Sequence, residues 1–71
     1  MRIRMKKAER ERFTRDRARE LAASGEYANW LMIDAVLRRA ALAVPDDRLF
    51  REELDLACQR ATGKPAYGNL F

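Results

Sequence analysis

The sequence has 71 residues, which is the length of one small domain. Apolar residues make up 48% and charged residues 37% of the chain, a balance that excludes a disordered or a membrane-embedded protein. The net charge is +4, and the chain has one cysteine and no histidine. This composition excludes an intramolecular disulfide, a typical zinc module and the Ser-His-Asp or Cys-His catalytic arrangements. Carboxylate chemistry is the remaining catalytic alternative, and we expect no catalytic, cofactor or metal site and no small-molecule substrate.

The positive charge is concentrated near the beginning of the sequence. Residues 1–19 hold nine basic and three acidic side chains, whereas residues 20–71 hold six basic and eight acidic ones. Such a segment either attracts polyanions in a salt-dependent way or forms a solvated helix face with internal pairs such as Glu11 with Arg15. The candidate polyanion contacts are Arg2, Arg4, Lys6, Lys7, Arg10, Arg12, Arg15, Arg17 and Arg19.

The first helix is predicted from about Ala8 to Ser24. Residues 1–8 are predicted to be a flexible basic arm, because their alternating apolar residues do not continue the helical pattern that follows. Gly25 is suited to the left-handed position just past a helix end. The expected buried stripe is Thr14, Ala18, Leu21 and Ala22, with Phe13 at its edge.

The second helix is predicted from Trp30 to about Ala43, with Asn29 as its N-cap. Its core stripe is expected to be Trp30, Ile33, Leu37, Ala40, Ala41 and Val44. A second apolar stripe lies about 150° away at 100° per residue, so this helix is either sandwiched between neighbours or offers a face to a partner. The candidate partner face is Ala28, Leu31, Ala35 and Leu42.

The third helix is predicted to start after Pro45, with Asp46 and Asp47 as caps, and to run to about Ala61. Its expected stripe contains Phe50, Leu54, Ala57, Cys58 and Ala61, and we interpret Cys58 as a small buried apolar residue rather than a reactive thiol. Residues 63–71 are predicted to be a short apolar tail, which either docks on the core or contacts a partner. The candidate tail contacts are Tyr67, Leu70 and Phe71.

Together these elements predict an all-α protein. We expect a three-helix domain over residues 9–62, with the second helix at its centre, the basic arm at residues 1–8 and the tail at residues 63–71. No targeting or membrane-spanning segment is recognisable, and a single thiol suits a reducing compartment, so we expect a cytoplasmic location.

One set of residues, spread over the three predicted helices, can be compared with known proteins. The run from Ser24 to Trp30, followed by Ile33, Leu37 and Arg38 and later by Leu54, Asp55 and Cys58, resembles short all-helical bacterial proteins of uncharacterised function. The resemblance covers roughly residues 18–61. It implies a bacterial cytoplasmic protein and brings no activity with it.

The expected function is therefore a non-catalytic interaction module that has a protein partner or forms a homo-oligomer through the second helix. The alternative is a nucleic-acid accessory protein that contacts phosphates through the basic N-terminal segment. A groove-reading helix-turn-helix fits poorly, because the second helix begins with Trp30 and Leu31 where polar base-contacting groups are needed.

Overall fold

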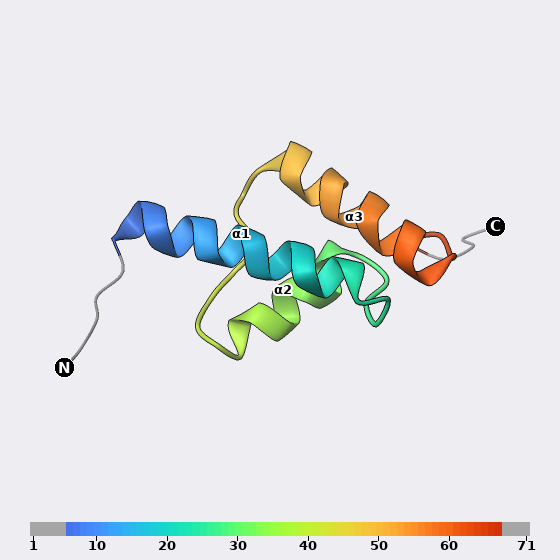
Figure 1. Ribbon diagram of the computed structural model, residues 1–71, viewed down its shortest axis with the longest axis horizontal. Helices are drawn as coiled ribbons and strands as arrows, with labels where there is room; N and C mark the ends of the chain where they lie inside the picture. Colours follow the sequence, from blue (N-terminus) through green and yellow to red (C-terminus); the bar gives the residue numbers. More distant parts are fainter. Residues whose placement is uncertain (1–5, 68–71) are drawn as a thin grey trace.

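A computed structural model of the protein describes residues 6–67, and within that range it contains three α-helices and no strand. These are α1 (Lys7–Ala23), α2 (Trp30–Arg38) and α3 (Arg48–Thr62), shown in Figure 1. The predicted all-α, three-helix class is confirmed.

The longest helix, α1, is the centre of the arrangement. It contacts both other helices, and its packing against α3 is the most extensive in the domain, whereas α2 and α3 meet least (Figure 1). The prediction that the second helix is central was therefore wrong. All three helices and the α2–α3 connection contribute to the core, which consists of Ala18, Leu21, Ala22, Ile33, Leu37, Val44, Phe50, Leu54 and Cys58.

The start of α1 lies outside this core. The helix begins at Lys7, so the last two residues of the predicted arm are helical, and residues 1–5 lie outside the described part of the chain. The first buried side chain is Thr14, whose hydroxyl donates to the Arg10 carbonyl at 2.7 Å. Because the residues from Lys6 to Phe13 are exposed, the first two turns of α1 offer their side chains to solvent.

Most helix ends lie close to the predicted positions, because capping side chains and glycines determine them. The Asn29 side chain accepts from the Met32 N–H, and the Asp47 side chain accepts from the Phe50 N–H, so each caps its helix. Gly63 ends α3 with φ +71°, and Gly25 follows α1 with φ +80°. A β-carbon on Gly25 would lie 3.3 Å from a carbonyl oxygen of α3, so the turn also needs glycine for its close approach to that helix.

The end of α2 differs from the prediction. The helix stops at Arg38 rather than near Ala43, and the Leu42 N–H closes it by donating to the Leu37 carbonyl at 2.9 Å. This geometry places Ala41 at φ +59°, a left-handed conformation that glycine usually occupies. Leu42 consequently lies in the connection, half-buried against the core, and is not part of an α2 face.

Asp34 fixes the connection that follows α2. Its carboxylate accepts from the Val44 N–H at 2.8 Å and from the Arg38 Nε–H at 2.7 Å. Burial alone would raise the pKa of Asp34, but these two hydrogen bonds outweigh it and hold the pKa below its ordinary value. Val44 is thereby held in the core although it is not helical.

Candidate interaction surfaces

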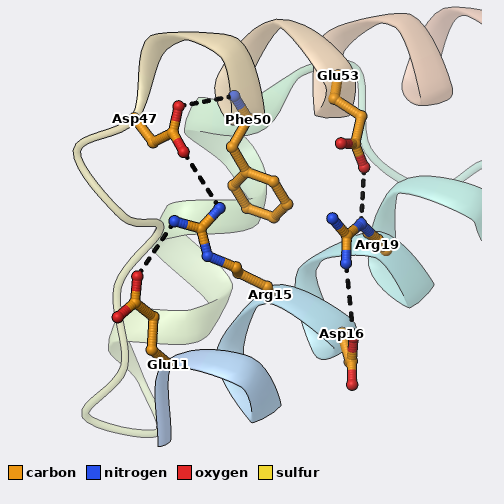
Figure 2. Close-up of polar contacts among 7 residues, drawn as sticks. All are labelled: Glu11, Arg15, Asp16, Arg19, Asp47, Phe50 and Glu53. Carbon is orange, nitrogen blue, oxygen red and sulfur yellow. Dashed lines mark hydrogen bonds and ion pairs between the residues drawn. The ribbon is translucent and has the colours of Figure 1, made fainter. Parts of the chain in front are cut away.

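Arg15 joins α1 to the beginning of α3. Its guanidinium donates to Glu11 at 3.1 Å and to Asp47 at 3.3 Å, and it lies over the Phe50 ring at 4.7 Å from the centroid (Figure 2). The Phe50 N–H bond lowers the pKa of Asp47, partial desolvation opposes this, and the nearby Arg15 lowers it further. One arginine thus links a cap, an ion pair and an aromatic core residue.

Arg19 makes the second link, one turn further along α1. Its Nε–H donates to Glu53 at 2.7 Å, a terminal nitrogen lies 3.5 Å from Asp16, and the guanidinium is 5.2 Å from the Phe50 centroid (Figure 2). The hydrogen bond to Glu53 raises the pKa of Arg19 above its usual value. Arg15 and Arg19, both predicted as polyanion contacts, are therefore occupied by the α1–α3 contact.

The other predicted basic contacts divide into three groups. Arg17 pairs with Glu20 on the same helix at 3.0 Å, and Arg10 donates to the Ala41 carbonyl at 2.6 Å. Lys6, Lys7 and Arg12 are exposed and form no ion pair within residues 6–67. Arg2 and Arg4 lie outside the described residues. The basic side chains that remain available are thus at the start of α1.

The outward side of α2 is partly apolar and open to solvent. Leu31 is 51% exposed, Ala35 lies one turn further and is also exposed, and Met32 beside them is 45% exposed. We call Leu31, Met32 and Ala35 the α2 patch. Of the predicted partner face, Leu31 and Ala35 belong to it, whereas Ala28 is half-buried in the preceding turn and Leu42 packs on the core.

A second exposed apolar pair lies on α3 and was missed from the sequence. Leu49 is 76% exposed and Leu56, two turns further on the same face, is 53% exposed. Their spacing of seven residues was a usable signal. Exposed Glu52 and Glu53 lie between them in the sequence, so this face is interrupted by charge.

The chain after α3 is tied back to the start of α2. Asp55 accepts from the Trp30 N–H at 2.9 Å and from the Tyr67 hydroxyl at 2.8 Å, while the Asn29 side chain donates to the Ala66 carbonyl at 2.8 Å. Desolvation and the bond to Asp55 raise the pKa of Tyr67. Tyr67 is thus docked through its hydroxyl, and the other two predicted tail contacts, Leu70 and Phe71, lie outside the described residues.

The single thiol lies inside the domain, as predicted. Cys58 is fully buried in the core cluster. Desolvation raises its pKa, and the negative charge of Asp55 adds to the effect. The thiolate that nucleophilic or metal chemistry would require is therefore disfavoured.

A groove of about 600 Å³ lies between the first two turns of α1 and the α2–α3 connection. Basic residues Lys7, Arg10 and Arg38 line it together with apolar Leu42 and Pro45. The rest of the lining is Glu11, Thr14, Ala41 and Ala43. Sequence reasoning missed this groove, because it depends on the early end of α2 and on contacts between segments about thirty residues apart, such as Arg10 with Ala41.

The described helices include none with the length and hydropathy needed to cross a membrane. Residues 6–67 also bring together no group of three or more cysteine, aspartate or glutamate side chains that could hold a metal ion. Comparison of the chain with protein-family models, curated proteins and solved structures finds no match. The resemblance to short helical bacterial proteins stays a prediction.

Proposed function

We propose that the protein is a non-catalytic helical interaction module that self-associates through the α2 patch. The observation that supports this most is the exposure of Leu31, which is 51% accessible on a helix whose other side is buried. Adjacent exposed apolar side chains favour burial against another protein surface. A two-fold axis across α2 would place the same patch on both subunits, which is the commonest arrangement in homodimers.

The size of the domain adds to this argument. A chain of about 70 residues buries a smaller fraction of its surface than a larger domain does, so covering α2 from outside would add useful stability. The lone buried Cys58 suits a reducing compartment, and we place this function in the cytoplasm. The proposal includes no cofactor and no small-molecule substrate.

Sedimentation equilibrium over a wide range of protein concentration tests the proposal. We expect the wild type to dimerise and Leu31→Glu to remain monomeric, because the new carboxylate would be buried unpaired in the interface. Leu49→Glu is the matched control: Leu31 and Leu49 are each the second residue of a helix, so an added carboxylate affects the helix dipole equally.

Two results would contradict the proposal. One is a wild type that stays monomeric at every concentration. The other is a dimer that survives Leu31→Glu and dissociates in Leu49→Glu, which would move the interface to α3. Circular dichroism of both variants establishes that they are folded.

The exposed start of α1 supports a second candidate, contact with nucleic-acid phosphates. Lys6, Lys7 and Arg12 are exposed there and have no carboxylate partner in the described part of the chain. Positive side chains in such a position bind phosphates without reading bases. The internal pairs of Arg15 and Arg19 reduce the number of contacts that the sequence alone suggested.

Titration of fluorescent duplex and single-stranded DNA at several salt concentrations tests this candidate. We expect binding that weakens steeply with salt and that is largely lost when Lys6, Lys7 and Arg12 are changed to Gln. The control changes Arg39, Arg60 and Lys64 to Gln, which removes the same charge from exposed positions outside α1. Equal losses in both triple variants, or no salt-dependent binding, would overturn it.

A further inference from the structure

The groove between α1 and the α2–α3 connection has the chemistry of a peptide site. We propose that it binds an extended acidic segment of a partner protein, with carboxylates on its basic rim and an apolar side chain on Leu42 and Pro45. This surface is separate from the α2 patch, so the proposal is independent of self-association.

The charge of the groove determines which partner it fits. Lys7 has no ion pair within residues 6–67, and Arg10 is an exposed guanidinium that is bound through one terminal nitrogen to the Ala41 carbonyl. Arg38 uses its Nε–H for Asp34 and leaves most of its side chain exposed. Glu11, the acidic residue of the lining, is paired with Arg15 at 3.1 Å. The rim therefore complements carboxylates, which arginine binds especially well.

The backbone of the connection favours a peptide over a small anion. Residues 42–45 belong to neither a helix nor a turn, and Ala43 is exposed. Within the described chain, the N–H and carbonyl of Ala43 make no hydrogen bond. An extended segment lying beside this stretch can pair with both groups, as in β-strand addition. Alternate side chains of that segment would then point to the basic rim and to the apolar floor.

Fluorescence anisotropy at low salt tests the proposal with three labelled hexapeptides. One alternates glutamate and leucine, one alternates lysine and leucine, and one alternates glutamate and serine. We expect saturable binding of the first, no binding of the second and weaker binding of the third, because only the first supplies both carboxylates and an apolar side chain. Equal binding of all three peptides, or no saturable binding of the first, would refute the peptide site.

Two double variants locate the binding. Lys7→Gln with Arg38→Gln should weaken the glutamate–leucine peptide about tenfold, the effect of losing two exposed ion pairs. Arg39→Gln with Arg60→Gln removes the same charge outside the groove and should leave the affinity unchanged. If Arg38→Gln disturbs the fold, the single variant Lys7→Gln takes the place of the double variant. It breaks no ion pair in the described structure, and it should still weaken binding of the glutamate–leucine peptide.

Equal effects of the two double variants would overturn the assignment to the groove. A single-stranded oligonucleotide is the competing occupant. If it binds and loses affinity in the Lys7 and Arg38 variant while the peptide does not bind, the groove is a phosphate site and the peptide proposal fails.

Discussion

Ala41 carries the main backbone strain among the described residues. Its φ of +59° is the only positive value at a non-glycine position from residue 6 to residue 67. A β-carbon in this conformation crowds the following carbonyl, at a cost of about 1–2 kcal/mol. The strain persists because the Leu42 N–H closes α2 and because Arg10 binds the Ala41 carbonyl. The residue also lines the proposed peptide groove.

Replacing Ala41 with glycine should therefore stabilise the protein. Relief of the β-carbon strain outweighs the greater backbone entropy of glycine in the unfolded chain, so we expect a gain of about 0.5–1 kcal/mol in the free energy of unfolding. Urea denaturation followed by circular dichroism measures it. Ala40→Gly, at the exposed neighbour without positive φ, should instead destabilise the protein, and a loss of stability in both variants would show that Ala41 is unstrained.

Helix ends differ in how they are encoded. The caps at Asn29 and Asp47 each use a side chain that binds a backbone N–H three residues away, so a short stretch of sequence contains the whole interaction. The end of α2 has no such local signal. Alanine and leucine at positions 40–43 favour continuation of the helix, and the structure ends it because Leu42 packs on the core and Asp34 binds the Val44 N–H.

The two consecutive aspartates before α3 allow a matched test of capping. Asp47→Ala should lower the urea midpoint, because the Phe50 N–H loses its side-chain acceptor and Arg15 loses one of its two carboxylate partners. Asp46→Ala should have much less effect, since its side chain is 98% exposed and lies 3.5 Å from its one described ionic partner, Arg51.

The loss of stability in Asp47→Ala should depend on pH. The folded state holds the pKa of Asp47 below its usual value, so its ionised form is favoured by folding. That stabilisation is complete above the unfolded pKa of about 4 and is lost as the pH falls through the lower folded value. Urea midpoints measured from pH 6 to pH 3 should therefore converge for the wild type and Asp47→Ala. A constant difference down to the lowest pH would contradict the role of the carboxylate.

The whole molecule depends on contacts that no local pattern contains. Most buried positions of α1 and α3 were predictable from periodicity, because apolar spacing marks which face is covered, but Ala61 of the expected α3 stripe is exposed. Their preferential packing on each other was not, since it involves pairs such as Arg15 with Asp47 and Arg19 with Glu53, more than thirty residues apart. The same limit applies to the basic segment, because the carboxylates that pair with two of its arginines come from distant parts of the chain and meet them only in the folded protein.

Leu54 is the residue at which this packing can be tested for the domain as a whole. It is fully buried on α3, whereas Leu56 two residues later is 53% exposed. A domain of this length has a free energy of unfolding of about 4–10 kcal/mol, and removing a buried leucine side chain costs about 2–5 kcal/mol. Leu54→Ala should therefore lose a large share of the stability, and Leu56→Ala should stay within about 0.5 kcal/mol of the wild type.

Thermal denaturation at low protein concentration, where self-association does not contribute, measures the stability of both variants. Because Leu54 belongs to a core cluster to which all three helices contribute, the variant should unfold in one transition. A partial transition that leaves α1 and α3 helical would show that α2 can detach, and would contradict a single cooperative core.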